Sequence, residues 1–569
     1  MTEDTPAETF ILKRKSTLIW SAIGLGWLFD FLFWQKVPGI SIAIYLLVLT
    51  AVGFLLASIE DLKPARSVYL LLIPLGFFSI MTVVRVEPFT TFLNVAISLT
   101  LMGTIVHSFL GGKWWQYRFK DFLGGAFGVG LDALYRQIAV FASQPKPEEA
   151  EKESARQQGT RKTLSVLRGL LIALPIVLIF AAMLAEADPI FGDAFDQFVE
   201  IFNIDNLGEY IFRAILIGVL AYLILGVYLH AYYKNHDETL SPEEKRLLPR
   251  FLGITEASIV LGSVNLLFLV FVGIQFRYFF GGDSNINLSG YTYAEYARRG
   301  FSELVTVAVF SLILFLGLSF ITKKEERQSQ RLFSILGVVL FALVSVILVS
   351  SFQRLLLYED AYGFTRLRTY THVFIIWLGA LLLAVSMLEL FKRQRYFALA
   401  ALIAGVGFAV SLNVLNVDGF IVRQNIARMA NGSSFGSDGT GDRYSTGSLV
   451  DVGYLATLSE DAVPVLSKLY LKADSVLERQ VIAGAIACHA EMNDGYDYEE
   501  SGYQDYTWQS FHLARFRAQQ DWQARSESPE AGNFTVYFDD GAENEPGWWA
   551  GYVIIGEEEV SCGTTYYWD

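Results

Sequence analysis

The sequence predicts an all-α polytopic transmembrane helical bundle of about 11 spans, followed by a small C-terminal α+β extracytoplasmic domain. Of the 569 residues, 53% are hydrophobic and only 18% are charged, which is too apolar for a soluble chain of this length. The apolar residues form continuous runs of about 20, the length that one helix needs to cross a hydrocarbon core. Because helices satisfy their backbone groups within one run, a helical bundle follows. The runs are 17–34, 39–58, 67–84, 89–110, 163–184, 210–233, 254–276, 301–322, 332–352, 371–391 and 397–415.

Basic residues are concentrated in alternate loops, and this pattern predicts the orientation. Cytoplasmic loops of membrane proteins carry an excess of Lys and Arg. With the N-terminus inside, the inner segments hold 25 basic residues and the outer loops hold eight. Lys13, Arg14 and Lys15 precede the first run and no small-residue cleavage site follows it, so we expect an uncleaved signal anchor. Eleven spans then place the C-terminal tail outside.

The C-terminal tail is strongly acidic. The net charge of the chain is −14, and residues 418–569 alone hold 9 Lys and Arg against 25 Asp and Glu. An acidic soluble part excludes nucleic acid as a partner, because phosphate binding requires a basic surface. Membrane lipid is the partner that the composition predicts. Cys488 and Cys562, the only cysteines, both lie in this tail, where an oxidising compartment permits a disulfide. Such a bridge contributes about 4 kcal/mol in the chain-entropy model; two separate buried thiols are the alternative.

Composition divides the chain into five segments. They are residues 1–110, an N-terminal four-span bundle; 111–162, a cytoplasmic amphipathic insert and linker; 163–417, a seven-span core; 418–448, a helix extension and Gly/Ser linker; and 449–569, the acidic extracytoplasmic domain. Within the insert, Leu131, Leu134, Ile138 and Phe141 recur at helical spacing, which predicts an amphipathic helix lying in the membrane interface.

The tail sequence predicts a small module of helices and strands. Helices are expected from residue 464 and over 476–490 and 507–522, and short strands over 533–538 and 552–555. No Ser-His-Asp, Cys-His or zinc-ligand spacing occurs in it. We therefore expect no catalytic residues, no cofactor and no metal site.

Five polar residues fall within or at the ends of the apolar runs: Asp30, His107, Arg213, Glu256 and Asn265. Ionisable groups in membrane helices are costly and indicate functional sites. A central Asp costs about 3 kcal/mol unless it is paired or hydrated. Two interpretations remain open: the groups pair with one another inside the bundle, or they line a pathway for a substrate or protons.

Arginines on the predicted outer face run against the charge bias. Six of the eight external basic residues fall in residues 275–303 and 354–368. Arginine offers a planar donor fork for carboxylate or phosphate, and tyrosine hydrogen-bonds at headgroup level. The segments predict either a site for an anionic ligand, such as a lipid headgroup or envelope component, or an ion-pair lattice with neighbouring acids, Glu359 among them, that packs loops or docks the acidic tail. The candidate residues are Arg277, Tyr278, Tyr293, Glu295, Tyr296, Arg298, Arg299, Glu303, Tyr358, Asp360, Tyr362, Arg366 and Arg368.

These segments also carry a family resemblance. Residues 267–282, the Tyr-Ala-Glu-Tyr-Ala-Arg-Arg-Gly-Phe stretch at 293–301, residues 358–368, and the tail segments 451–455 and 461–464 resemble a bacterial family of polytopic membrane proteins of unknown function, number 4173, with 4153 a close relative. The resemblance covers roughly residues 160–470. It implies a multi-pass protein of the bacterial cytoplasmic (inner) membrane and carries over no activity.

Three classes of function are compatible with the sequence. We favour an integral membrane protein that binds an anionic envelope ligand or partner through its outer Arg/Tyr/Glu surface. A secondary transporter or channel using Asp30, Glu256 and Arg213 is the first alternative, although no internal repeat or paired discontinuous helices are evident. A membrane enzyme acting on a lipid-linked substrate is the second, with Glu295, Asp360 or His107 as acid or base, but no spacing marks a nucleophile. Neither the ligand nor the oligomeric state follows from the sequence.

Overall fold

A computed structural model describes residues 12–143, 207–233, 251–279, 301–323, 327–430, 451–494, 507–527, 531–538, 551–556 and 558–562, with scattered positions between 177 and 191. Within this part of the chain, ten helices are long and apolar enough to cross a membrane. The prediction of a polytopic helical bundle is therefore confirmed. The predicted run 163–184 falls outside the described residues apart from scattered positions.

The chain forms two compact units that are interleaved in sequence. The first comprises Met1–Trp34, Val48–Pro64 and Ala126–Asn235, and the second comprises Gln35–Leu47, Ala65–Gly125 and His236–Asp569. The four N-terminal spans are thus divided between the units, which differs from the grouping of residues 1–110 as one bundle. Lipid surrounds all spans equally, so hydropathy alone does not specify which helices associate.

The first unit is built around a pair of adjacent helices, α1 (Lys15–Phe33) and α8 (Leu207–Tyr233). It also contains the second half of α2 (Ile40–Ile59) and most of α5 (Phe119–Ser143). Tyr228 on α8 donates its hydroxyl to the carbonyl oxygen of Leu49 at 2.6 Å, and Tyr232 donates to that of Gly53. These bonds join α8 to α2 one helical turn apart.

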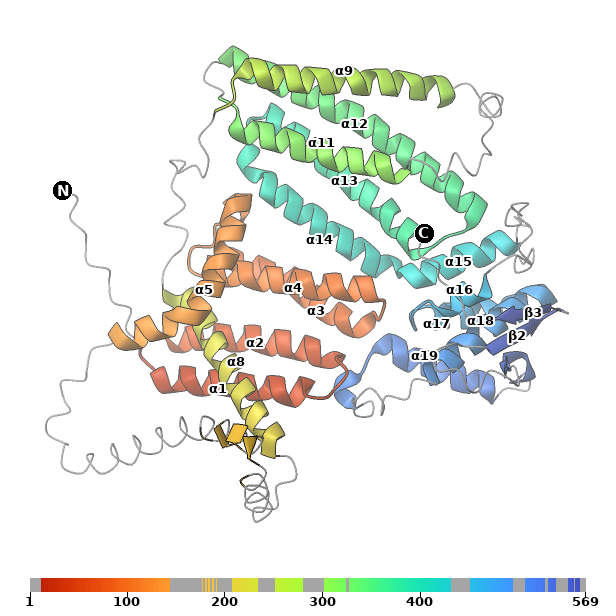
Figure 1. The fold of residues 1–569 in the computed structure, drawn as a ribbon, viewed down its shortest axis with the longest axis horizontal. Helices are drawn as coiled ribbons and strands as arrows, with labels where there is room; N and C mark the ends of the chain where they lie inside the picture. The colour runs from red at the N-terminus through yellow and green to blue at the C-terminus, as the bar shows by residue number, and fades with distance from the viewer. Residues whose placement is uncertain are drawn as a thin grey trace. The chain divides into compact units, whose positions relative to one another are not determined.

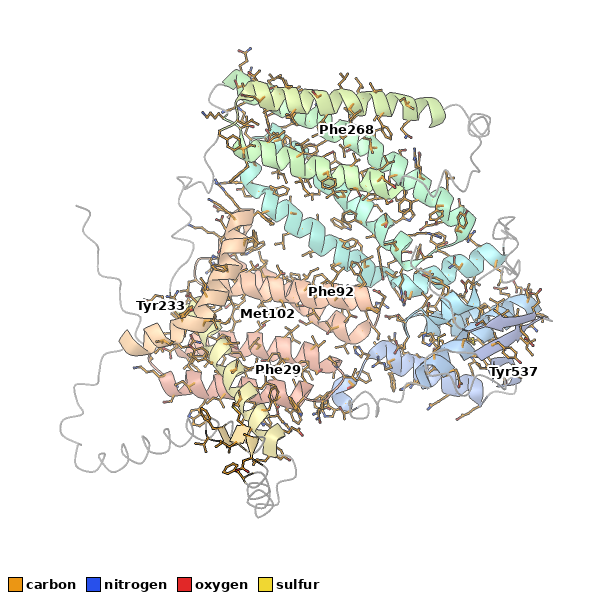
Figure 2. All side chains as sticks on the ribbon, in the orientation of Figure 1. Phe29, Phe92, Met102, Tyr233, Phe268 and Tyr537 are labelled. Carbon is orange, nitrogen blue, oxygen red and sulfur yellow. A yellow bond between two sulfur atoms is a disulfide. The ribbon has the colours of Figure 1, made fainter. Side chains whose placement is uncertain are left out.

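The second unit contains the larger set of spans. They are α3 (Tyr69–Val84), α4 (Pro88–Ser108), α9 (Ile254–Phe279), α11 (Phe301–Ile321), α12 (Arg327–Tyr362), α13 (Arg366–Leu390) and α14 (Phe397–Leu415). Helix α12 packs against α9, α11 and α13, while α14 packs against α13 and α4 (Figure 1). Phe315, Phe333 and Phe341 are buried between the helices, whereas Phe92 on α4 is 66% exposed and stands on the outside (Figure 2). Apolar side chains on both faces are expected where lipid replaces water.

The C-terminal domain follows a sharp bend at Asn416. Its helices are α15 (Val417–Ala430), α16 (Val452–Ala456), α17 (Val463–Tyr470), α18 (Val476–Asp494) and α19 (Leu513–Ser526). Strands β1 (Tyr537–Phe538), β2 (Gly551–Ile555) and β3 (Glu558–Ser561) form an antiparallel sheet in that order. The α+β prediction is confirmed, with differences in detail. Residues 531–534 form a 3-10 turn, β3 was not predicted, and the last helix begins six residues later than expected.

Helix α15 belongs to the core of the C-terminal domain. Its residues Ile421 and Ile426 are buried in one cluster with Leu455, Leu466 and Ile482 of the later helices. In Figure 1 the tail helices and strands gather beside α15. Helix α15, from Val417, therefore shares one apolar core with the later helices and packs against α17 and α18; the predicted boundary near residue 449 stays a prediction.

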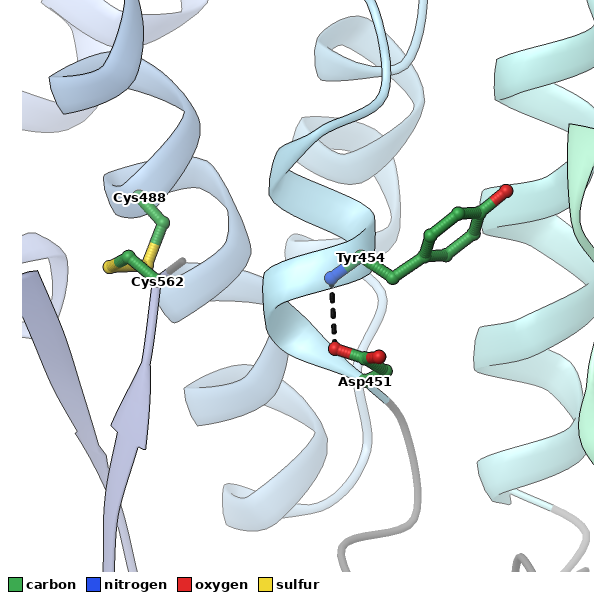
Figure 3. Close-up of a disulfide and its surroundings, with 4 residues drawn as sticks. All are labelled: Asp451, Tyr454, Cys488 and Cys562. Carbon is green, nitrogen blue, oxygen red and sulfur yellow. Dashed lines mark hydrogen bonds between the residues drawn. A yellow bond between two sulfur atoms is a disulfide. The ribbon is translucent and has the colours of Figure 1, made fainter. Parts of the chain in front are cut away.

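Cys488 and Cys562 are joined by a disulfide (Figure 3). Their Cα atoms lie 5.2 Å apart, and 74 residues separate them in sequence. Cys488 lies on α18 and Cys562 directly follows β3, so the bond ties the sheet to the central helix of the domain. In the same view, the side chain of Asp451 caps α16 by accepting a hydrogen bond from the amide of Tyr454 at 2.8 Å.

Candidate functional site

Asp418, in the first turn of α15, is the centre of a buried polar junction between the spans of the second unit and the C-terminal domain. Arg366, the first residue of α13, holds it with both arms of the guanidinium group: Nε lies 2.8 Å from Oδ1 and Nη2 lies 2.7 Å from Oδ2. Ser459 donates its amide at 2.7 Å and its hydroxyl at 2.6 Å to Oδ2. Asp418 is completely buried. A buried carboxylate is stable only when paired and hydrogen-bonded in this way.

Local sequence at the α14–α15 bend places Asp418 in this position. Asn416 adopts the left-handed conformation, with φ +52°, which Asn tolerates better than most residues. Its side-chain oxygen accepts from the amide of Gly419 at 3.2 Å and so starts the new helix. Further along α15, Asn425 binds both backbone groups of Phe364, at 2.8 and 3.0 Å, and fixes the chain just before Arg366.

A second ion pair fastens the domain to the α3–α4 loop. Nη1 of Arg85 lies 3.0 Å from Oδ1 of Asp461, whose other oxygen accepts from the amide of Val86 at 2.9 Å. The Nε of Arg85 also donates to the carbonyl oxygen of Asn413, at the end of α14, at 3.0 Å. Burial raises the pKa of Asp461, although Arg85 and the amide favour its charged form.

Adjacent polar residues join the ends of α4, α13 and α14. Glu87 is buried and caps α4 by accepting from two amides of its first turn, at 3.0 and 2.7 Å. The hydroxyl of Tyr370 on α13 donates to the same carboxylate. Asn94 and Asn413 exchange amide hydrogen bonds of 3.1 and 2.7 Å in a fully buried pair. Each group supplies the hydrogen bond that its neighbour needs, which is required of buried polar networks.

The loop between α1 and α2 forms a third contact with the domain. Ser510 donates its hydroxyl to the carbonyl oxygen of Val37 at 2.7 Å, and the amide of Ile40 donates to that of Phe511 at 3.0 Å. Gly39 lies between them, and a Cβ atom there would come within 2.5 Å of the Ser510 carbonyl carbon. The two backbones therefore touch, and only glycine fits at this position.

Two histidines of the domain are kept neutral by their surroundings. His512 donates from Nε2 to the carbonyl oxygen of Pro38 at 3.0 Å, and His489 donates from Nε2 to that of Leu458 at 2.8 Å. Burial lowers the pKa of both imidazoles. His489 is almost completely buried. Their neutral form stabilises the docked, folded domain.

Of the sequence-predicted outer-face residues, those on α12 and α13 contact other parts of the protein. The guanidinium carbon of Arg368 lies 3.9 Å from the centre of the Tyr358 ring, and its Nη1 donates to the carbonyl oxygen of Gly363. The Tyr362 ring lies 5.0 Å from that of Tyr358. Arg366 is bound to Asp418, and Arg354 of the same segment donates to the side-chain oxygen of Gln275 at 3.1 Å, so all three arginines of residues 354–368 are engaged within the chain. The contacts of Arg366 and Arg368 in the described part of the chain are with Asp418, aromatic rings and backbone groups.

Two of the acids that the sequence proposed as lattice partners, Asp360 and Glu303, are exposed. Asp360 is exposed, and its backbone carbonyl accepts from Arg428 of α15. Glu303 is exposed in the first turn of α11, where it accepts from the hydroxyl of Ser302 at 2.9 Å. The side chains of Arg277 and Tyr278, and all of Tyr293, Glu295, Tyr296, Arg298 and Arg299, lie outside the described residues.

Two of the five intramembrane polar residues form an ion pair. Nε of Arg213 on α8 lies 3.0 Å from Oδ1 of Asp30 on α1, and Nη2 lies 2.7 Å from Oδ2. The guanidinium carbon also lies 5.7 Å from the centre of the Trp34 ring. Asp30 is 3% exposed, so the pair compensates a buried charge.

The other three do not join this pair. Asn265 on α9 donates to the carbonyl oxygen of Leu336 on α12 at 2.9 Å. Glu256 is exposed in the first turn of α9, and the ring of His107 packs edge-on against Tyr117 at 5.6 Å. Glu256 belongs to the other compact unit from Asp30 and Arg213, so a polar pathway through all three residues stays a prediction.

Sequence reasoning missed the acids of the junction. Asp418 lies in the acidic tail and Asp461 in the segment 461–464 of the family resemblance, and neither was among the predicted site residues; Glu87 lies between the apolar runs 67–84 and 89–110. A signal was available in the sequence. Asn416, a residue type that tolerates the left-handed conformation, is followed by Asp418, and an Asp in the first turn is typical of the N-terminus of a helix. A further buried pair was also missed: Glu359 Oε1 lies 3.1 Å from His372 Nδ1.

Residues 72–469 match the family described as "Domain of unknown function (DUF4153)". The chain belongs to this family. The resemblance found in the sequence named family 4173 and gave family 4153 as a close relative, and the family shown is 4153. The match also begins well before residue 160, within α3. It includes Arg85, Arg366, Asp418, Ser459 and Asp461, so the whole ionic junction lies inside the family region. No curated protein and no solved structure matches the chain.

Proposed function

We propose that this membrane protein serves as an envelope-facing binding protein of the bacterial cytoplasmic membrane, whose spans hold a disulfide-bonded domain at the outer face. The observation that carries this proposal is the buried Arg366–Asp418–Ser459 contact, together with the Arg85–Asp461 pair. A buried charge pair is weak evidence for stability, and we propose that these pairs instead fix the domain in a single geometry. A domain fixed in this way presents a constant surface to an external ligand.

Three features support the proposed orientation. The α1–α2 loop contacts the C-terminal domain, so the chain entering α1 starts on the opposite side of the bilayer from that domain. Opposite sides require an odd number of spans. The ten described spans and the predicted run 163–184 together make eleven. The loop charges place the domain outside, and its disulfide fits an oxidising compartment.

The transporter alternative receives less support from the geometry. Asp30 finds its counter-charge in Arg213, which accounts for both residues as a structural pair. The domain is also fastened to three separate connections of the second unit: the α1–α2 loop, the α3–α4 loop and the α12–α13 segment. Rocking of one helix group against another, the usual basis of alternating access, would have to break these buried contacts.

We propose that an anionic ligand, a lipid headgroup or an envelope component, binds through the arginines that precede α11. Arg366, Arg368 and Arg85 already bind groups of the chain itself. Arg298 and Arg299, the adjacent basic pair that the sequence predicts on the outer face, lie outside the described residues. Their guanidinium forks suit phosphate or carboxylate.

The test is native mass spectrometry of the full-length protein in nanodiscs of phosphatidylcholine and phosphatidylglycerol. We expect Arg298→Ala/Arg299→Ala to keep the wild-type melting temperature and to lose bound phosphatidylglycerol. The exposed inner pair Lys392→Ala/Arg393→Ala is the matched control, with the same charge change. A double variant that retains both the lipid and every copurified envelope component, as the control does, would overturn the ligand proposal. Unchanged lipid binding with loss of a copurified envelope component would instead identify the latter as the ligand.

A further inference from the structure

Helix α5 is long but is not among the described helices apolar enough to span a membrane. Within the first unit it exposes five large apolar side chains: Phe127 (70% exposed), Leu131 (41%), Leu134 (48%), Tyr135 (64%) and Ile138 (63%). Their spacing of three and four residues places them on one face of the helix. Such a continuous apolar face requires a partner.

The opposite face of α5 is held by α8. Oδ2 of Asp132 lies 2.7 Å from Nδ1 of the buried His230. The side-chain nitrogen of Gln137 donates to the carbonyl oxygen of Tyr222 at 2.6 Å, and the Tyr222 hydroxyl returns a bond of 2.6 Å to the carbonyl oxygen of Leu134. Asp132 and Gln137 therefore face α8, and the five exposed apolar side chains lie on the other side of the helix.

The two helix backbones touch where they cross. A Cβ atom added at Gly226 would lie 2.6 Å from the Cα of Ala133, so glycine permits this approach. Arg136, next on the same face, binds Asp132 and stacks on the Tyr233 ring at 4.6 Å. Burial alone would raise the pKa of Asp132, but the hydrogen bonds from Arg136 and His230 outweigh it and lower that pKa. The carboxyl group of Asp132 is therefore held in its charged form.

The contacts on α8 locate α5 relative to the bilayer. They run from Tyr222 to Tyr233, the last three turns of a membrane span. At a rise of 1.5 Å per residue, the crossing at Gly226 lies about 10 Å from the end of that helix. This is the depth at which interfacial amphipathic helices lie, with their apolar face in the acyl-chain boundary.

We propose that the exposed face of α5 is a lipid-binding surface, embedded in the inner leaflet where α8 ends. The surface is continuous with the lipid-facing side of a membrane span, and lipid is what surrounds a span at this depth. Water would leave five large apolar side chains hydrated, and a second protein chain would have to displace lipid from a helix that is clamped beside a span.

Quenching by brominated lipid tests this proposal in the full-length protein. Single cysteines replace Phe127, Leu131 and Ile138, are labelled with bimane without reduction of the native disulfide, and are placed in nanodiscs containing dibromophosphatidylcholine. Leu55→Cys, at a 59% exposed position of α2, is the lipid control. Asp61→Cys, where the side chain is 75% exposed, is the water control.

We expect the three α5 positions to be quenched by the lipid as strongly as position 55 and several-fold more than position 61. Quenching by aqueous iodide to the level of position 61 would overturn the proposal. Protection from both quenchers would also overturn it, because a protein partner would then cover the face. The three side chains point away from α8, so each position reports independently if one variant fails to fold.

Discussion

Replacing Asp418 by Asn should release the C-terminal domain from the spans. The carboxylate accepts two bonds from Arg366 and two from Ser459, and it is completely buried. Asn has nearly the same shape, but it leaves the guanidinium group without its counter-charge and turns an amide group toward a donor. Removal of one partner of a buried ion pair costs about 3–5 kcal/mol. Since Asn keeps one acceptor oxygen, we expect about 3 kcal/mol, or about a hundredfold shift toward the undocked state.

Hydrogen exchange measured by mass spectrometry on the full-length protein in nanodiscs provides the assay. Amides of residues 452–470 should exchange about a hundredfold faster in Asp418→Asn if opening of the junction limits their exchange. Arg366→Lys, which keeps the charge and loses the fork, should give an intermediate rate. Asp360→Asn is the control, because it removes the same charge from an exposed position. Wild-type exchange in Asp418→Asn would refute the reasoning that this ion pair docks the domain.

Three further predictions concern the domain and the span beside it. Removing the disulfide with Cys488→Ser/Cys562→Ser should cost about 4 kcal/mol of unfolding free energy in urea titrations, because it closes a long loop. A midpoint that is insensitive to reductant would contradict this. Burial lowers the pKa of His489, so its contribution is complete above about pH 6.5 and is lost as pH falls, by up to about 1.4 kcal/mol per pH unit. His489→Asn should flatten that pH dependence of the melting temperature, and an unchanged profile would exclude this origin. Asn413→Ala should lower the free energy of unfolding by about 1–3 kcal/mol, because it leaves the buried Asn94 without its partner. The double variant Asn94→Leu/Asn413→Leu leaves no unpaired amide and should melt closer to wild type. If the single and the double variant lose the same melting temperature, the amide pair does not explain the effect.

Local sequence properties predicted much of the architecture. The spans around Asp30 or Asn265 were found from hydropathy, because a helix in lipid satisfies its own backbone and needs no partner to form. The continuation of the chain as a helix after Asn416 and the α+β nature of the tail were also predicted. Strand β3 was missed, since it depends on pairing with β2 rather than on its own residues.

The partners of the charged residues could not be predicted. The sequence placed Arg366 in the predicted outer-face segment and proposed nearby acids as its partners, yet its counter-ion in the structure is Asp418, 52 residues away and behind a bend. Likewise, Asp461 pairs with Arg85 across 376 residues of sequence. The sequence indicates that a buried arginine needs an acidic partner. It does not indicate which of the many Asp and Glu residues that partner is.

The sequence by itself determined how often the chain enters the bilayer, because hydrophobicity acts on each segment separately. Tertiary structure alone decided which helices pair, which later helices α15 packs against and which acids the C-terminal domain uses to attach. Lipid treats every apolar span alike, so these choices arise only from hydrogen bonds, ion pairs and close backbone contacts that form after the helices exist.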